Sequence, residues 1–467
     1  MIRKLFSSQL RINMVSGVAA TLLNTVVLAA GYPIYLHFLG YEQYGVWLVL
    51  ATVLTFAHLG NLGINQAVTK LVAEEYGRGD IQAIQQYVVS AMVLLCFSGL
   101  LVLIVLVAMR GAIMPAFRLA DDNARTVSWL LPYVGGLSVY VFLTEVLQGT
   151  LSGLGRMDLA NGIQSLGGLV KLIVASLLLF AGLGIEGLLI AAVVSRVGVH
   201  VVSLLCIRRI VPLRLVRMEN WNSQRGKCLL RFGTGVLGSS LLSMLLSPFN
   251  KVMLSRYAGV ASIPIYEIAY TGSMQVRGLA EAGIRALMPE VSRLGANLAG
   301  QATTRIREIN RRCVGLIIHF ALPLYGILFL MAPVLLRIWL GDRFTEPLSL
   351  AFRIALLGSL LSLTCVPAYY LLLGMGRVRH CFMNHAILAG TNVLLVLTFA
   401  WMDNRLALPE VLISAAIGMG LSSMYTILQN RRMLRHVSTS NGMGQDLSKE
   451  HEIGGPRHIY ANRVQNM

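Results

Sequence analysis

The sequence has few charged residues, and acidic residues are the scarcer kind. Asp, Glu, Lys and Arg make up 13% of the 467 residues, with 21 acidic against 39 basic side chains. A soluble domain carries about a quarter charged residues, so this composition excludes a soluble enzyme. The formal charge of +18 does not indicate a nucleic-acid partner, because the basic residues fall in short gaps between apolar runs rather than on one solvated domain.

Cysteine is also scarce and follows no pattern. The six cysteines are scattered, without a Cys-x-x-Cys pair, and most lie in or beside apolar runs. This disfavours a disulfide framework or a metal site and indicates unreactive core positions. The sequence contains no nucleophile triad, no phosphate-binding glycine loop and no carboxylate pair. We therefore expect neither an enzyme nor a cofactor.

Long hydrophobic runs dominate the rest of the sequence. Hydrophobic residues make up 56% of the chain, and the mean hydropathy is +0.68. A helix needs about 20 apolar residues to cross a bilayer, so we predict an all-α integral membrane protein with about twelve transmembrane helices. The predicted spans are 12–36, 45–67, 83–109, 127–149, 160–182, 185–207, 229–253, 262–288, 313–336, 347–373, 381–401 and 408–429.

The positions of the basic residues orient these spans. With the N-terminus inside, 26 of the 39 Lys and Arg residues fall in inner segments and 9 in outer segments. Because basic residues accumulate on the cytoplasmic side, we expect both termini in the cytoplasm. The outer loops are short, which disfavours membrane glycosyltransferases and polymerases.

Two sequence matches at nearly the same offset indicate an internal repeat. A Gly-x-Gly-Arg turn at 153–156 recurs at 374–377, and Leu-x-x-x-Gly-Ile at 59–64 recurs at 279–284. Six spans separate the copies, so both keep the same orientation, as in the parallel repeats of transporters. We predict two six-helix lobes around a central cleft. The predicted units are an N-terminal lobe (1–212), a basic cytoplasmic linker (213–228), a C-terminal lobe (229–436) and a disordered cytoplasmic tail (437–467).

Three short motifs resemble those of a known family. The sequence FLGYEQYG at 38–45 resembles the Leu-Gly-x-Glu-x-Tyr-Gly signature of bacterial polysaccharide flippases, and 59–70 is similar to the end of their second helix. With the Gly-x-Gly-Arg turns, they resemble the O-antigen and exopolysaccharide lipid-linked oligosaccharide flippases (the Wzx type). This family belongs to the superfamily of multidrug, oligosaccharidyl-lipid and polysaccharide exporters.

The resemblance implies that the protein exports an undecaprenyl-diphosphate-linked oligosaccharide across the bacterial inner membrane by alternating access, for O-antigen, lipopolysaccharide or exopolysaccharide assembly. It implies as partners the polyprenyl-diphosphate-linked glycan, membrane lipids and the polysaccharide polymerase machinery. One departure is Asn250-Lys251, where the family often has Asp and a basic residue. The alternatives are a cation-coupled multidrug extruder of the same superfamily and, less favoured, a membrane-embedded enzyme of polysaccharide assembly.

Charged residues inside the predicted spans are the candidate site residues, because a charge in the bilayer is costly and marks function. One interpretation of Lys171 is that it binds a diphosphate or an acidic sugar as a point charge. The alternative is that it forms a salt bridge with Glu145. Arg196, with His200 one turn later, is a second candidate anion ligand, and the alternative is an arginine that snorkels or bonds to carbonyl groups. Glu145 is also a candidate ion-coupling residue.

A polar stripe is predicted on the eighth span. Arg277, Glu281 and Arg285 recur every four residues and therefore share one helical face. The repeat relates the last two to Asn61 and Asn65 in the second span. Because such stripes would be costly against lipid, we expect them to line the cleft and bind the substrate. The alternative is a self-neutralised ladder that holds the helix in its lobe.

Overall fold

The computed structural model describes residues 2–61, 63–119, 121–211, 221–285, 308, 310–315, 317–374, 377–403 and 405–452. Within these ranges the chain is helical and contains no strand. The N-terminal half consists of α1 (Ile2–Ala57), the 3-10 turn η1 (His58–Asn61), α2 (Ile64–Arg78), α3 (Ile81–Ala108), α4 (Arg110–Phe117), α5 (Asp121–Gly153), α6 (Met157–Phe180) and α7 (Gly184–Ile210).

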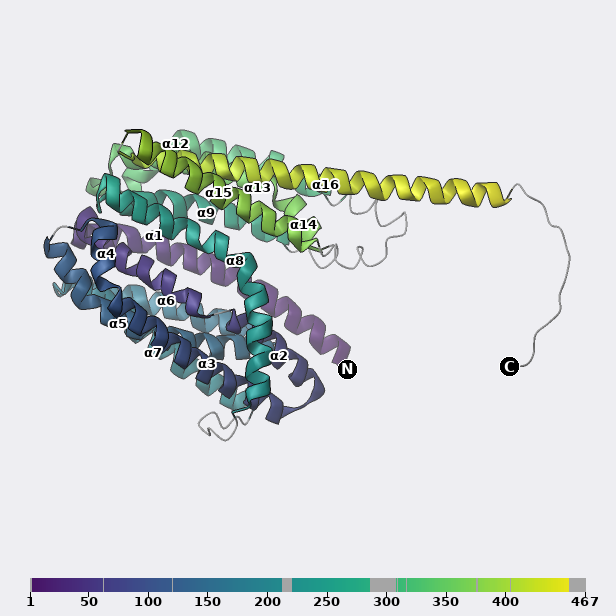
Figure 1. Cartoon of the computed structure of the whole chain (residues 1–467), viewed down its shortest axis with the longest axis horizontal. Coiled ribbons are helices and arrows are strands. Elements are labelled where there is room, and N and C mark those ends of the chain that lie inside the picture. The colour runs from purple at the N-terminus through teal and green to yellow at the C-terminus, as the bar shows by residue number, and fades with distance from the viewer. Residues whose placement is uncertain are drawn as a thin grey trace.

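The C-terminal half begins at α8. Its elements are α8 (Ser223–Ala258), α9 (Ser262–Arg285), the π-helical turn η3 (Ile317–Ala321), α12 (Leu322–Leu340), the 3-10 turn η4 (Gly341–Arg343), α13 (Glu346–Thr364), α14 (Val366–Gly374), α15 (Val378–Asp403) and α16 (Leu408–Glu452). The two halves form two helical lobes, as predicted (Figure 1).

Among the described residues, nine helices are long and apolar enough to cross a membrane, so the chain is a multi-pass membrane protein. The first, Val15–Thr55, covers most of the first predicted span and about half of the second, and the other eight coincide with eight more. The remaining predicted spans, 229–253 and 262–288, fall on α8 and α9, which are not among the nine. The total of twelve therefore stays a prediction.

The first two predicted spans begin as two helices, and the chain reverses direction between them at Gly40. Gly40 has φ 66° and ψ −176°, a backbone conformation that glycine adopts without steric cost. The ring of Tyr44, after the turn, lies 6.4 Å from that of Tyr32 and 5.7 Å from that of Tyr35, both before it. The motif at 38–45 therefore forms a helical hairpin turn. We call this end of the protein the Gly40 end and the opposite end the N-terminal end.

The second predicted span is not one continuous helix, which corrects the expectation that Asn61 and Asn65 share a helical face. The helix ends at Ala57, and α2 starts only at Ile64 after Gly63, whose φ of 69° is left-handed. A Cβ atom at Gly63 would lie 2.3 Å from the Gly233 carbonyl oxygen. The helix is therefore interrupted before Ile64, and the backbone at Gly63 lies close to α8. Hydropathy alone does not predict this interruption.

The repeat is visible in the backbone. The Arg156 amide donates to the Leu151 carbonyl at 3.0 Å, and the Arg377 amide donates to the Leu372 carbonyl at 2.9 Å. These two hydrogen bonds are related by the offset of 221 residues that relates the two Gly-x-Gly-Arg turns. The turns therefore have the same backbone bond in both lobes, in line with a parallel repeat.

The lobes meet at the Gly40 end and diverge towards the N-terminus (Figure 1). The Trp339 indole donates to the Ala29 carbonyl at 2.8 Å, and the Tyr41 hydroxyl donates to the Arg343 carbonyl at 2.6 Å. One cluster of buried hydrophobic side chains continues through both lobes here, from Leu36 to residues of α8, α9, α12 and α13. This end of the interface is therefore closed by packed side chains.

The bounds of the predicted linker and tail stay a prediction, and parts of both segments are helical. Asn222 caps α8 by accepting hydrogen bonds from the amides of Gln224 (2.9 Å) and Arg225 (3.1 Å), so residues 223–228 already belong to α8. The remaining linker residues up to 220 lie outside the described residues. At the other end, α16 continues to Glu452, through the first part of the tail that we expected to be disordered, and 453–467 lie outside the described residues.

Candidate anion-binding cavity

A cavity of about 450 Å³ lies within the N-terminal lobe. Its walls come from both halves of α1 and from α5, α6 and α7, and Glu267 of α9 adds one side chain from the other lobe. Small residues make room for it, because Gly31, Gly167 and Gly168 all lie in the wall. The polar side chains in the wall are Asn24, Gln164, Lys171, Ser195, Arg196 and Glu267. We call this the first cavity.

Lys171 and Arg196 lie at similar depths in neighbouring helices. Lys171 is 14 residues after the start of α6, and Arg196 is 14 residues before the end of α7. Each therefore lies about 21 Å from the helix terminus on the side of the protein's N-terminal end. Both side chains are half-buried and line the first cavity. Two cations thus line one cavity inside apolar helices.

Lys171 has neither a hydrogen bond nor an ion pair with any residue that the structure describes. The salt bridge between Lys171 and Glu145 that we considered as the alternative is therefore not formed. Since an uncompensated ammonium group in a membrane helix is costly, Lys171 is a candidate ligand for an anion.

Arg196 lies where the first cavity adjoins a second one of about 280 Å³. Arg196 and Gln164 line both cavities, and the Arg196 guanidinium donates to the Gln164 side-chain oxygen at 3.5 Å. The second cavity extends towards the N-terminal end, and its wall is mostly polar. Its polar side chains are Asn65, Thr69, Glu145, Gln148, Ser152, Asn161, Gln164 and Arg196. His200 lines neither cavity and stacks on Tyr140 instead.

Glu145 lines the second cavity and also contacts Asn61, which lies where the helix is interrupted after α1. The Asn61 side-chain amide donates a hydrogen bond to the Glu145 carboxylate. The Asn61 side-chain oxygen in turn accepts from the Asn65 backbone amide at 3.4 Å. Glu145 and Arg196 both line the second cavity and interact electrostatically. Four of the predicted site residues are therefore brought together here: Asn61, Asn65, Glu145 and Arg196.

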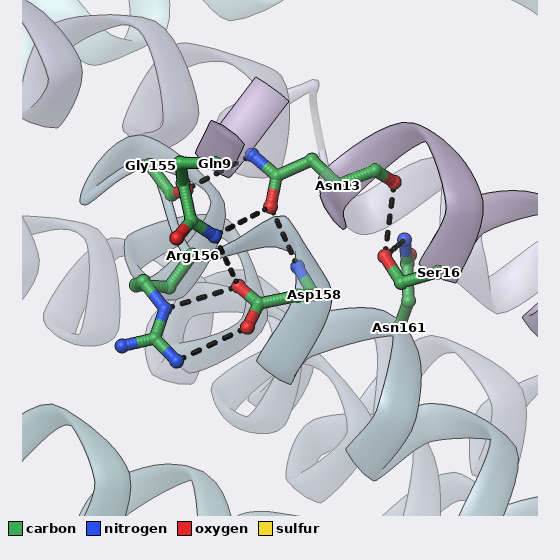
Figure 2. Close-up of polar contacts among 7 residues, drawn as sticks. All are labelled: Gln9, Asn13, Ser16, Gly155, Arg156, Asp158 and Asn161. Atoms are coloured by element: carbon green, nitrogen blue, oxygen red, sulfur yellow. Dashed lines mark hydrogen bonds and ion pairs between the residues drawn. The ribbon is translucent and has the colours of Figure 1, made fainter. Parts of the chain in front are cut away.

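Side chains near the start of α1 bind to the turn before α6 and to the first residues of α6 (Figure 2). One of these residues, Asn161, also lines the second cavity. Asn13 donates to the Gly155 carbonyl at 3.0 Å and accepts from the Asp158 amide at 3.1 Å, and the Gln9 amide donates to the Asp158 carboxylate at 3.0 Å. The same carboxylate forms two hydrogen bonds of 3.0 Å with Arg156 and raises the pKa of that guanidinium. The repeated Gly-x-Gly-Arg turn thus anchors α1 in the N-terminal lobe.

The polar stripe on α9 is largely neutralised within the C-terminal lobe. Arg277 forms a salt bridge of 3.1 Å with Glu281, and the Tyr370 hydroxyl donates to the same carboxylate at 2.5 Å. Neither Arg277 nor Glu281 lines the first or the second cavity. The side chain of Arg285 lies outside the described residues. This geometry fits the ladder alternative better than a ligand role for Arg277 and Glu281.

Other charged and polar residues of the C-terminal lobe are paired as well. Lys251 and Glu267 form a salt bridge of 2.7 Å with side chains 11% and 17% exposed. Asn392, the repeat counterpart of Lys171, forms a hydrogen bond of 2.8 Å with Asn250. At the position of Lys171, which faces a cavity in the N-terminal lobe, the C-terminal lobe therefore has a buried neutral residue.

Aromatic residues at the Gly40 end of the first cavity are not evident from the sequence. Tyr32, Tyr35, Tyr44 and Trp47 all line it, from the two halves of α1. An aromatic residue does not stand out among the apolar residues of a hydrophobic helix. In the sequence, only Tyr44, as part of the motif at 38–45, marks the Gly40 end of the cavity. Among the described residues, no group of three or more His, Cys, Asp or Glu side chains could hold a metal ion.

Residues 10–294 match the family of polysaccharide biosynthesis proteins. No curated protein matches the sequence. The fold is similar to that of an inward-facing multidrug resistance MATE family transporter of the MOP superfamily, with a TM-score of 0.71 at 15% identity over 92% of this chain and 98% of that one. It is also similar to the lipid II flippase MurJ in an inward closed conformation, with a TM-score of 0.69 at 12% identity over 97% of this chain and 94% of that one. A MOP superfamily transporter from Pyrococcus furiosus has a TM-score of 0.63 at 15% identity over 91% of this chain and 96% of that one.

Proposed function

Because the chain belongs to the polysaccharide biosynthesis protein family and has the fold of membrane transporters and flippases, we propose that it flips a polyprenyl-diphosphate-linked oligosaccharide. The direction is from the cytoplasmic to the periplasmic leaflet of the bacterial inner membrane, with both termini in the cytoplasm. The product would be used for O-antigen or exopolysaccharide assembly, where a polysaccharide polymerase consumes it.

One observation carries this proposal: Lys171 and Arg196 line a single cavity inside membrane helices, and Lys171 has no anionic partner in the described part of the chain. Each such cation costs about 2.5–3.5 kcal/mol in a bilayer on the translocon-insertion scale. A diphosphate offsets that cost, because the Arg guanidinium forms bidentate hydrogen bonds with phosphate and the Lys ammonium adds a point charge. The cavity is therefore suited to the anionic head of a lipid-linked glycan.

The proposed mechanism is alternating access by movement of the two lobes. The lobes are packed together at the Gly40 end, whereas the polar second cavity extends from Arg196 towards the N-terminal end. The head group would pass the second cavity, reach Lys171 and Arg196, and leave when the contacts at the Gly40 end separate. The polyprenyl chain would remain in the bilayer between the lobes. We do not extend the anion site to Arg277 and Glu281, and a ligand role for Arg285 stays a prediction.

Glu145 is our proposed ion-coupling residue, because its carboxylate lines the second cavity together with Arg196. Protonation of Glu145 would remove an internal anion that competes with the substrate for Arg196. Glu145→Gln removes the charge and keeps an acceptor for Asn61. In proteoliposomes with an imposed proton gradient, this variant should lose the response of the flipping rate to the gradient. An unchanged response would exclude Glu145 as the coupling group.

The cation-coupled multidrug extruder is the alternative within the same fold. A cationic drug would meet Lys171 and Arg196 in the first cavity, and the Glu267 carboxylate there is paired with Lys251. The charge of the cavity therefore favours an anionic substrate. A membrane-embedded enzyme of polysaccharide assembly is disfavoured because the sequence contains no catalytic motif.

The proposed function is tested in cells whose own copy of the gene is deleted. Lys171→Ala and Arg196→Ala should each abolish surface polysaccharide at unchanged protein levels, measured by electrophoresis of extracted glycans and by immunoblot. Arg405→Ala is the matched control, because Arg405 is exposed outside the cavities and should support full surface polysaccharide. Full surface polysaccharide with both cavity variants would overturn the cavity assignment.

A further inference from the structure

The first cavity has two chemically different ends. Phe38 contacts Phe180 with ring centroids 6.5 Å apart, so the C-terminal end of α6 lies at the Gly40 end. Counting residues from there, Lys171 is about 13 Å deep and Arg196 about 18 Å deep. Tyr35 and Trp47, counted from the Gly40 turn, are only about 8–10 Å deep. An aromatic region thus lies closer to the Gly40 end than the two cations do.

Tyr35 and Trp47 have ring surface left for a ligand. Tyr32 and Tyr44 are only 4% exposed, so they present little ring surface to the cavity and instead pack against each other across the hairpin. Tyr35 and Trp47 are half-buried and line the same cavity. Large rigid rings bind a partner at low entropic cost, and their negative faces attract the weakly positive C–H groups on the flat side of a pyranose ring. A diphosphate has no such group.

Glu267 adds a hydrogen-bond acceptor from the opposite lobe. Its helix, α9, begins at Ser262, close to the Gly40 end, because a Cβ atom at Gly45 would lie 2.4 Å from the Val260 carbonyl oxygen. The salt bridge to Lys251 uses one side of the carboxylate and fixes its position. A carboxylate has about four acceptor positions, so positions remain for sugar hydroxyl groups.

We propose that Tyr35, Trp47 and Glu267 form the sugar subsite of this cavity, which takes the pyranose attached directly to the diphosphate. This inference rests on the proposed function. The sugar packs on Tyr35 and Trp47 and donates hydroxyl hydrogen bonds to Glu267, while the diphosphate contacts Lys171 and Arg196. Sugar preference is then set at the Gly40 hairpin rather than in α6 and α7. The bound sugar also joins the two lobes, since Glu267 belongs to the second.

The test compares two probes on the full-length protein in lipid nanodiscs. One probe is farnesyl diphosphate, and the other is a panel of the same lipid diphosphate carrying a single glucose, galactose or N-acetylglucosamine. Wild type should bind at least one glycosylated probe about tenfold more tightly than farnesyl diphosphate in titration calorimetry. Trp47→Ala and Tyr35→Ala should abolish that preference and leave the affinity for farnesyl diphosphate unchanged. Lys171→Ala should weaken binding of both probes.

Two further variants separate the subsite from a general loss of folding. Trp47→Phe retains an aromatic face and should keep part of the preference, whereas Trp401→Ala, at a position 86% exposed outside the cavity, should keep all of it. Equal binding of every probe by wild type, or an equal loss for both probes in Trp47→Ala, would overturn the sugar subsite. Failure of wild type to bind farnesyl diphosphate, or binding that Lys171→Ala does not weaken, would instead count against the proposed function.

Discussion

At the scale of single residues, the cations inside the helices are of two kinds: some form a salt bridge with an acidic side chain, and others do not. Arg277 has Glu281 at 3.1 Å, whereas Lys171 has no such partner among the described residues. A paired cation contributes to the fold, and an unpaired one is retained at a cost in stability. The two residues therefore have opposite expected effects when their charge is removed.

Lys171→Met should raise the melting temperature in detergent, because it replaces a costly ammonium group by an apolar side chain of similar length. Arg277→Met should lower it, because Glu281 loses its counter-charge. For Arg277 we expect a loss of about 1–3 kcal/mol, less than for a fully buried pair, since its side chain is 26% exposed. A lower melting temperature for Lys171→Met would mean that Lys171 has a structural role.

The sequence identified Lys171, Arg196 and Glu145 because a charge inside an apolar run is conspicuous. It did not identify Tyr35 or Trp47, because aromatic residues are common in hydrophobic helices and only the hairpin at Gly40 brings them to the cavity. The pairing of Arg277 with Glu281 could be expected from their spacing of four residues. Whether that face pointed to a cleft or into its lobe depended on tertiary packing.

At the scale of helices, hydropathy predicted where apolar segments lie but not where they break. The span predicted at 45–67 is interrupted at 58–63, because Gly63 takes a left-handed conformation and approaches Gly233 in α8. The break places Asn61 against Glu145 rather than on the helical face of Asn65. A local glycine geometry therefore decides how two of the predicted polar residues are used.

Gly63→Ala should destabilise the protein strongly. The added Cβ would lie 2.3 Å from the Gly233 carbonyl oxygen, a backbone atom that cannot rotate away, and a left-handed alanine costs about 1–2 kcal/mol by itself. Gly77→Ala is the matched control, since Gly77 lies inside α2 with no neighbour within 4 Å, and alanine there should gain up to about 1 kcal/mol. Thermal unfolding in detergent measures both. Equal melting temperatures for Gly63→Ala and wild type would disprove the tight contact.

At the scale of the whole molecule, the two lobes share a backbone plan but differ in charge. The same turn and the same backbone hydrogen bond recur in both. The N-terminal lobe directs Lys171 and Arg196 into a cavity, whereas in the C-terminal lobe Lys251 is paired with Glu267, and Arg277 with Glu281. We expect the first lobe to hold the anionic head group and the second to move against it.

The most direct test of this account is a flipping assay with the purified protein in proteoliposomes. The probe is a short-chain polyprenyl diphosphate that carries a fluorescent oligosaccharide, and a membrane-impermeant quencher measures how much reaches the opposite leaflet. We predict that wild type transfers the probe, that Arg405→Ala transfers it equally fast, and that the Lys171→Ala, Arg196→Ala double variant transfers none above protein-free liposomes. Transfer by the double variant at the wild-type rate, or no transfer by wild type, would contradict the account.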